Sequence, residues 1–359
     1  MSVVLHVDGD RWRAHLREVA ARRPGLVPVI KGNGYGFGNA RLARKAGWLG
    51  AEAVAVGTYD EVPDVAPRYD GDLVVLTPWR PFAPEVPASL STRVVHTVGR
   101  LEDLAALLAT ETRPRVILER MTSMKRHGFT ARGLREATSL IAAHRGGPGV
   151  TVEGTSIHLP LGHGEDNLKE ADRLLTDVVA AGLAQADDRG PAQVWVSHLS
   201  ADALATLAGR YPEVRFRPRA GTELWLGERG ALRVTAQVLD SHPVERGETF
   251  GYRGRAIPRN GTLLVVSGGT AHGIGLEAPS GDLGLKARVG TLARGGLDAV
   301  GMARSPYTVG GKLRYFAEPP HMQASMLFLP SGTQVPAVGD EVELRVRFTA
   351  TAFDRVEIS

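Results

Sequence analysis

The sequence contains no cysteine, and this absence removes several kinds of chemistry. None of its 359 residues is a thiol that could form a disulfide, ligate zinc or act as a nucleophile. We predict no metal site. Long apolar runs are also missing from the amino terminus, where MSVVLHVDGD has only a short apolar run without a positive flank. We therefore expect neither a signal peptide nor a membrane anchor. The expected location is the cytoplasm.

Blocks of one charge are absent as well. The 43 basic and 39 acidic side chains leave a net charge of +4, and the arginines are spread along the chain. This pattern argues against a nucleic-acid partner. Lysine is scarce, with six lysines among the 43 basic residues. A lysine kept where arginine fills most basic positions is a candidate for a position that needs an amine able to lose its proton.

What the sequence does contain is an ordinary globular composition and a strand-helix alternation. A hydrophobic content of 43% and a length of 359 residues indicate about two domains with cores of their own. Eight short β-branched runs alternate with helix-periodic stretches such as residues 101–110, 131–144 and 171–184. The predicted strands are residues 26–31, 53–57, 73–77, 93–98, 115–120, 150–158, 193–198 and 214–219. This alternation predicts an α/β fold, a (β/α)8 TIM-type barrel over residues 1–225.

The pattern changes after residue 225. Segments 231–240, 261–269 and 340–350 alternate between apolar and polar residues without helices between them, and Gly/Pro turns separate them. We predict a second, mostly β domain over residues 226–359, with which the first strand, residues 2–7, could pair.

The most specific local signal is VIKGNGYGFG, residues 29–38, which places Lys31 at the end of a predicted barrel strand and before a glycine-rich turn. The carboxyl ends of barrel strands form active sites, where a lysine of lowered pKa can form a Schiff base. The glycines allow a close approach of the backbone to an anion such as a phosphate. The alternative is a surface lysine beside a flexible loop.

This motif resembles the pyridoxal-phosphate lysine motif of the alanine racemase family, Lys-Ala-Asn-Ala-Tyr-Gly-His-Gly. The resemblance implies that Lys31 forms the Schiff base with pyridoxal 5'-phosphate and acts as a general base, and that Tyr35 reaches the cofactor phosphate. Family members of this fold type III class combine a barrel with a β domain.

Further segments resemble the family's motifs in the same order. LERMTSMKRHGF (118–129), GTSIHLP (154–160), SHLSADAL (197–204) and FRPRAGTELWLG (216–227) are the segments within the barrel. They imply Arg126 at the cofactor's phenolic oxygen and at the substrate, His158 beside the ring, Ser200 at the phosphate, Arg219 at the pyridine nitrogen, and the amides of Gly221 and Thr222 at the phosphate. Alone, His158 would be read as a core histidine and Arg219 as half of a surface ion pair.

The resemblance is incomplete at the second base. The family's racemases use a tyrosine from the partner subunit, but the corresponding stretch, VVSGGTAHGIG (265–275), has none. His272 is the titratable residue there and is a candidate base, with a polar residue in a turn as the alternative. Tyr252 and Tyr307 are more distant candidates. Glu119 replaces a barrel lysine that is often carbamylated, and Met322, expected near the substrate carboxylate, precedes Gln323 where the family has aspartate.

The resemblance therefore implies a pyridoxal-phosphate-dependent, racemase-like enzyme acting on an amino acid. Racemisation of alanine and a related α-proton reaction on another amino acid both remain open, as does a phosphate-binding barrel unrelated to the cofactor. The alternative from another class is a non-catalytic protein that binds pyridoxal phosphate or an amino-acid adduct. The resemblance also implies a homodimer with shared active sites.

Overall fold

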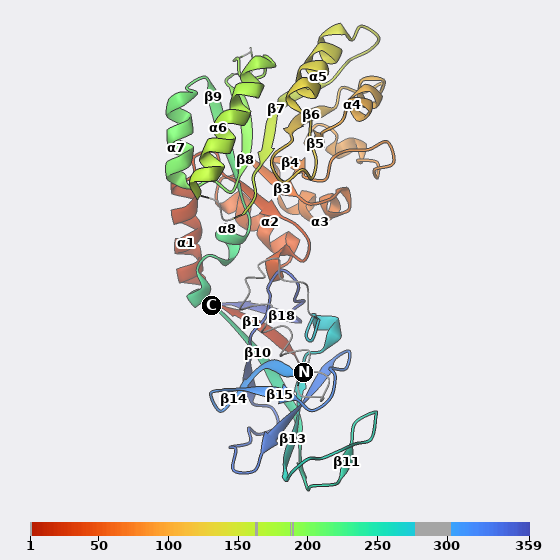
Figure 1. Ribbon diagram of the computed structural model, residues 1–359, viewed down its shortest axis with the longest axis vertical. Coiled ribbons are helices and arrows are strands. Elements are labelled where there is room, and N and C mark those ends of the chain that lie inside the picture. Colours follow the sequence, from red (N-terminus) through yellow and green to blue (C-terminus); the bar gives the residue numbers. More distant parts are fainter. Residues whose placement is uncertain (1, 162–163, 187, 189, 277–302) are drawn as a thin grey trace. The chain divides into compact units, whose positions relative to one another are not determined.

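The chain divides into two compact units, which are described separately. The structure, a computed structural model, describes residues 2–161, 164–186, 188, 190–276 and 303–359 (Figure 1). One unit is Arg13–Gly227, here called the barrel unit, and the other is Met1–Trp12 together with Glu228–Ser359, here called the β unit.

Eight parallel strands close into a barrel in the barrel unit. They are β2 (Val27–Ile30), β3 (Ala53–Val56), β4 (Asp72–Val75), β5 (Val94–Val98), β6 (Arg115–Arg120), β7 (Thr151–His158), β8 (Ala192–Ser197) and β9 (Val214–Ala220). Their ends differ from the predicted ones by two residues at most. Strand β9 pairs with β2 through Val27 and Arg219, which closes the ring. The prediction of a (β/α)8 barrel is confirmed.

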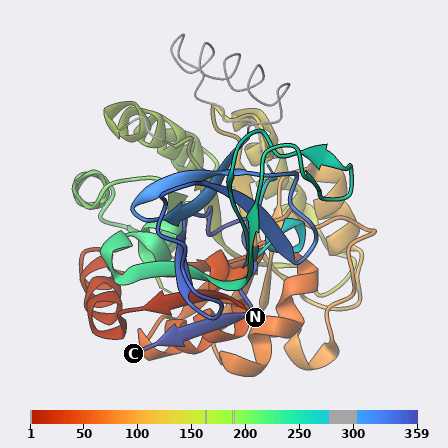
Figure 2. The same ribbon diagram turned by 90° about the horizontal axis from the view of Figure 1, so that it is seen from below.

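Helices connect the strands and lie on the outer side of the barrel (Figure 2). The α-helices are α1 (Gly9–Ala21), α2 (Asn39–Trp48), α3 (Val62–Val65), α4 (Leu101–Leu108), α5 (Ala131–Ala143), α6 (Gly164–Ala180), α7 (Ala201–Arg210) and α8 (Thr222–Leu226). Short 3-10 turns are η1 (Gly34–Gly36), η2 (Tyr59–Glu61), η3 (Ala66–Arg68), η4 (Ala88–Leu90), η5 (Arg229–Ala231) and η6 (Thr270–His272). Helix α6 begins seven residues before the predicted start at 171, because its first turns are polar and carry no apolar period.

The barrel strands are buried on both faces, which explains why they read as continuous apolar runs. All four residues of β2 and of β3 are buried. Side chains such as Val29, Ile117 and Trp195 fill the inside of the barrel. The Trp225 indole of α8 donates a hydrogen bond of 2.7 Å to the Val29 carbonyl and so ties α8 to β2.

The β unit is built on an eight-stranded sheet in the order β13-β16-β15-β14-β17-β10-β1-β18. Its strands are β1 (Val3–Val7), β10 (Leu232–Val244), β13 (Gly261–Ser267), β14 (Arg304–Val309), β15 (Lys312–Phe316), β16 (Ala324–Pro330), β17 (Glu341–Leu344) and β18 (Arg355–Ile358), with a small hairpin of β11 (Thr249–Phe250) and β12 (Arg255–Ala256). Strand β1 lies antiparallel to β10 and parallel to β18, as Figures 1 and 2 also show. A mostly β domain after the barrel was predicted and is confirmed.

The alternating segment 340–350 forms a strand only in part. Strand β17 covers Glu341–Leu344. The backbone then leaves the sheet and turns, with the Ala350 N–H donating to the Arg347 carbonyl over 2.8 Å. Within the described residues, every helix is too short or too polar to span a bilayer.

Candidate active site

Lys31 directly follows β2, at the carboxyl end of the barrel strands where TIM-barrel active sites form. Burial lowers the pKa of its amine, and the positive charges of Arg126 and Arg219 lower it further, while Glu61 acts in the opposite direction. The neutral amine is the form that attacks carbonyl carbon and accepts protons. The surroundings of Lys31 therefore increase the reactive fraction of its amine.

Glu61 is a site residue that the sequence analysis missed. Its carboxylate accepts hydrogen bonds from the backbone N–H of Gly32 (2.7 Å) and Gly57 (2.6 Å), on the ends of two neighbouring barrel strands. It thereby fixes the backbone next to Lys31. The available signal was Thr58-x-x-Glu61, which has the spacing of a helix capping box, and Glu61 does accept from the Thr58 N–H over 3.4 Å.

Tyr35 and Gly221 meet although 186 positions separate them in the chain. Tyr35 has a positive φ of 54° and a buried ring, so the glycine-rich turn directs the side chain inward. Burial, followed by the charge of Glu61, raises the pKa of Tyr35 to about 12, so its hydroxyl keeps its proton and can donate. A Cβ at position 221 would collide with that hydroxyl.

We expect Gly221→Ala to displace Tyr35 and to weaken binding of pyridoxal phosphate about 10- to 100-fold, the effect of losing one or two charge-assisted hydrogen bonds. Titration of the purified protein with the cofactor, followed by absorbance, measures this. Gly209→Ala in α7 is the matched control, because a Cβ there meets no atom within 4 Å. Equal affinities of the two variants would contradict the expected role of Gly221.

Arg219 and Glu119 are two ionisable residues of the site that lie on barrel strands β9 and β6. Arg219 on β9 donates from Nε to Ser197 Oγ (3.1 Å) and from Nη2 to the Ile157 carbonyl (3.3 Å), and burial lowers its pKa to about 10. Glu119 on β6 is 5% exposed, and its Oε2 has no hydrogen-bond partner in the described residues. Burial raises the pKa of Glu119, against the opposite effects of Arg219 and Arg126.

His158 on β7 belongs to the same network. Its Nδ1 is 3.0 Å from Ser197 Oγ, so Ser197 links the imidazole to Arg219. Burial lowers the pKa of His158 to about 2, and Arg219 and Arg126 contribute to this shift. The imidazole is therefore neutral at physiological pH. Ser197 was part of the SHLSADAL motif, but the sequence analysis gave it no role.

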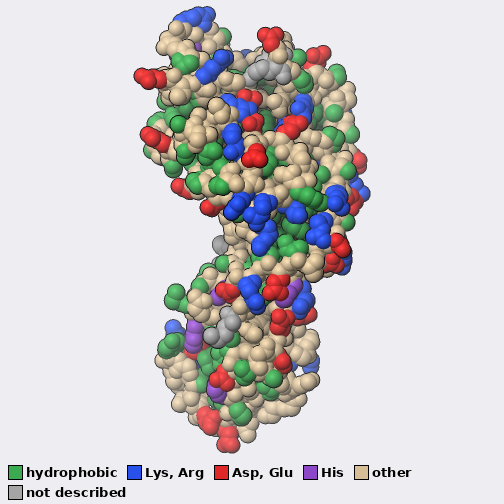
Figure 3. All heavy atoms as spheres, turned by 180° about the vertical axis from the view of Figure 1, so that it is seen from behind, with side chains coloured by type: hydrophobic (Ala, Val, Ile, Leu, Met, Phe, Trp, Pro, Cys, Tyr) green, Lys and Arg blue, Asp and Glu red, His purple; other side chains and the backbone are tan. Residues whose placement is uncertain are grey.

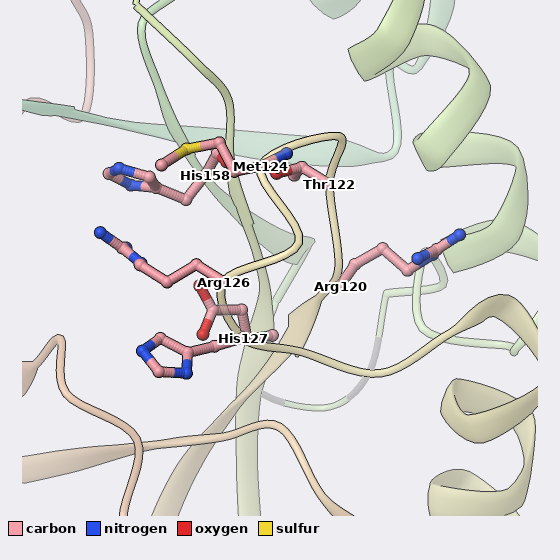
Figure 4. Close-up of a pocket in the computed structure, with 7 residues that line it drawn as sticks. Arg120, Thr122, Met124, Arg126, His127 and His158 are labelled. Carbon is pink, nitrogen blue, oxygen red and sulfur yellow. Dashed lines mark hydrogen bonds between the residues drawn. The ribbon is translucent and has the colours of Figure 1, made fainter. Parts of the chain in front are cut away.

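Figure 4 shows that Arg120, the last residue of β6, and Arg126, in the segment after β6, point to opposite sides. Arg126, His127, Met124 and His158 point to one side, toward a small pocket that Glu119 also lines. Arg120 points to the other side and donates to Asp177 of α6 over 2.8 Å. Arg126 is thus a cation of the site, while Arg120 anchors a helix.

Three residues that are predicted to bind the cofactor phosphate lie at the starts of two helices. Ser200 is the N-cap of α7, and its Oγ accepts from the Ala203 N–H over 3.1 Å, which leaves the hydroxyl proton free to donate elsewhere. Gly221 and Thr222 begin α8, where backbone N–H groups have no intrahelical partner. Figure 3 shows several Lys and Arg side chains close together on one face of the molecule.

His272 and Met322 belong to the β unit. The Gly269 N–H donates to Nδ1 of His272 (3.3 Å), and Nε2 lies 3.2 Å from the Asp354 carboxylate. The ring is 7% exposed, whereas Met322 is 70% exposed. Because both ring nitrogens have partners, this geometry favours the structural alternative for His272. Tyr307 donates to the carbonyls of Ser267 and Gly268.

We expect His272→Ala to lower the free energy of unfolding by about 1–3 kcal/mol, because it leaves buried polar groups without partners. Asp354→Asn should have an effect in the same direction, since Asp354 also accepts from the Val3 N–H over 2.7 Å. Chemical denaturation measures both variants. Loss of α-proton exchange in folded His272→Ala protein, with stability unchanged, would instead make His272 a base.

The barrel has eight strands, and at their carboxyl ends lies a lysine whose pKa is lowered by burial, by Arg126 and by the buried Arg219. This combination is typical of the class of barrel proteins that work through a reactive amine. The sequence model described as alanine racemase, N-terminal domain, matches residues 7–216. The chain therefore belongs to the alanine racemase family, as its motifs predicted.

Individual relatives agree with this assignment. An alanine racemase of Beutenbergia cavernae is 30% identical over 281 residues, which cover 73% of this chain and 72% of the relative. The solved alanine racemase from Bartonella henselae with covalently bound pyridoxal phosphate has a TM-score of 0.69 at 17% identity, over 100% of both chains. A histidine racemase from Leuconostoc mesenteroides has a TM-score of 0.66 at 17% identity, over 99% of this chain and 98% of its own. The two structures show the shared fold.

Proposed function

We propose that this protein is a pyridoxal-phosphate-dependent, racemase-like enzyme that acts on an amino acid, with Lys31 as the lysine that holds the cofactor. The observation that carries the proposal is the position of Lys31, at the carboxyl end of β2 with a pKa lowered by burial and by two arginines. Family membership and a relative with covalently bound pyridoxal phosphate support the choice of cofactor.

The residues present fit this cofactor. Tyr35, Ser200 and the amides of Gly221 and Thr222 supply donors for a phosphate, and the collision of a Cβ at 221 with Tyr35 indicates a site built for backbone approach. The buried Oε2 of Glu119 has no hydrogen-bond partner in the described residues, as expected where a polar group still has to be bound between Arg126 and Arg219.

The chain's own residues define what the site can do. When bound, pyridoxal phosphate makes the α-proton of an amino acid acidic by drawing electrons away from the α-carbon. Lys31 Nζ is the group that accepts this proton. Arg219 has a pKa of about 10 and keeps its proton at neutral pH, so it orients a ring nitrogen without protonating it. Arg126 supplies a positive charge for the substrate carboxylate.

The test is to add pyridoxal phosphate to the purified protein, record the visible spectrum, and follow α-proton exchange in deuterium oxide by NMR. A panel of L- and D-amino acids that includes alanine and histidine identifies the substrate. Exchange with loss of optical activity is the expected result. Bound chromophore without exchange of any amino acid would overturn the enzyme proposal in favour of a binding protein.

The proposal extends to assembly and location. We propose a homodimer in which the partner subunit contributes to each site, as the family resemblance implies, and a cytoplasmic location. Analytical ultracentrifugation at micromolar concentration measures the mass in solution, and a monomer that retains activity would contradict the shared site.

A further inference from the structure

His198 is, after His158, a second histidine at the carboxyl ends of the barrel strands, and it lies next to the site without an assigned role. It follows β8 directly, at the same carboxyl end as Lys31. Its backbone has a φ of 61°, a left-handed conformation that non-glycine residues rarely adopt. Such strain persists where the surroundings impose it, and it is common at functional sites.

A buried asparagine holds this conformation. Asn167 of α6 is 2% exposed, and its amide donates to the carbonyl of His198 (3.0 Å) and to that of Pro160 (2.9 Å). The strained backbone of His198 is therefore clamped between two barrel loops, which fixes the direction in which its side chain leaves the backbone.

The imidazole of His198 is aimed at the site. It packs edge-on against the ring of His158, with 5.2 Å between centroids and 85° between planes. In the described residues, neither ring nitrogen of His198 has a hydrogen-bond partner, and the side chain is exposed. The ring thus packs against His158 and has two nitrogens available to a ligand.

The charged groups around His198 come from three other strand ends. Partial burial of the ring lowers the pKa of His198, and Arg219 on β9, Lys31 after β2 and Arg126 after β6 lower it further, in that order. The neighbouring His158 on β7 is neutral. His198 is therefore mainly a neutral imidazole with a free lone pair at pH 7, within the electrostatic reach of the Lys31 amine.

We propose that His198 is the second acid-base group of the barrel site and works with Lys31 on the α-carbon of the amino-acid substrate. This inference rests on the proposed function. In one direction, Lys31 Nζ takes the α-proton, the electron pair of the C–H bond stays with the α-carbon, and protonated His198 delivers a proton to the other face. In the reverse direction, neutral His198 takes the proton and the Lys31 ammonium returns one. Exchange with water resets both groups.

Other candidates fit this role less well. His272 has partners on both ring nitrogens, and the hydroxyl of Tyr307 is buried against two backbone carbonyls. His158 has Nδ1 engaged by Ser197 and a pKa of about 2, which makes it a weak base. His198 combines exposure, a fixed direction and free nitrogens.

The deciding experiment compares His198→Gln with wild type for α-deuterium uptake from each enantiomer separately, in protein loaded with pyridoxal phosphate. We expect uptake from one enantiomer to fall about 100- to 10,000-fold, the usual effect of removing a general base, while uptake from the enantiomer served by Lys31 continues. The visible spectrum should be unchanged. His242→Gln, an exposed histidine of the β unit, is the matched control.

A second readout needs neither cofactor nor turnover. Histidine NMR titration of the full chain, assigned by the loss of one resonance in His198→Gln, should give a His198 pKa below 6.5 that rises in Lys31→Met, because a neighbouring cation is removed. An unmoved resonance in Lys31→Met would overturn the inference, as would unchanged or equally reduced uptake from both enantiomers in His198→Gln. Wild-type protein that exchanges neither enantiomer would overturn the proposed function itself.

Discussion

Lys31→Ala should lose the visible absorbance of bound pyridoxal phosphate and reduce α-proton exchange by at least about 100- to 10,000-fold. The substitution removes both the amine that would hold the cofactor and the base at the α-carbon. Lys31→Arg should fail in the same way, because a guanidinium keeps its proton and forms no Schiff base under these conditions. Absorbance spectra and exchange rates of the purified variants measure both effects.

Lys45 is a control that separates the proposed role of Lys31 from a general effect of removing a lysine charge. Lys45 on α2 also has a pKa lowered by burial, but its ammonium lies over the ring of Trp48, 4.5 Å from the centroid. Lys45→Ala should therefore keep both the absorbance and the exchange. A Lys31→Ala protein that still bound the chromophore covalently would remove Lys31 from the proposed role.

Glu119→Gln is expected to change activity and stability in opposite directions. The carboxylate lies in the field of Arg126 and Arg219, so its loss removes a negative charge that acts on two cations of the site. We expect exchange activity to fall by about 100-fold, the loss that a small misplacement of a catalytic group causes. Steady-state rates at saturating amino acid measure this effect.

The stability effect has the other sign because burial dominates the pKa of Glu119. Its folded-state pKa lies above the unfolded value of 4.5, so the fold favours the protonated carboxyl. The resulting contribution of Glu119 to the free energy of unfolding is complete below about pH 4.5, and it is lost as the pH rises through the raised pKa. Glutamine stays neutral throughout, so Glu119→Gln should melt about 2–4 °C above wild type at pH 7, the shift produced by 1 kcal/mol in a domain of this size.

The advantage of Glu119→Gln should disappear at pH 4, where the wild-type carboxyl is also protonated. Glu136→Gln is the control, because Glu136 pairs with Arg132 at the surface, 2.7 Å away, and its loss should leave the melting temperature unchanged at both values of pH. A lower melting temperature of Glu119→Gln at pH 7 would mean that attraction to the arginines exceeds the penalty of burial.

The barrel could be predicted from the sequence because its strands are buried on both faces. Runs such as AVAV in β3 contain only apolar residues, and their repetition with helices between them leaves few other folds. The strands of the β unit were harder to find. Strand β17 alternates buried and exposed residues over only four positions, so its end at Leu344 was not visible in the sequence.

For the candidate site, the sequence identified residue types but not their contacts. Lys31 and Arg219 stand in recognisable motifs, and their roles stay predictions. Asn167 of α6 donates to the His198 carbonyl across 31 positions of the chain, and Glu61 accepts from the Gly32 N–H across 29 positions. No periodicity encodes such contacts, because the closure of the barrel decides which loops become neighbours.

The pairing of β1 with both β10 and β18 has a consequence for biosynthesis. Val3 is the partner of Ala236, and Val4 is the partner of Arg355. A ribosome adds about 5–20 residues per second, so the first strand waits on the order of tens of seconds for its neighbours. All of Arg13–Gly227 has been made before the first of these neighbours is complete. The barrel unit can therefore fold during translation, while β1, which is synthesised before the barrel unit, is among the last elements to reach its native partners.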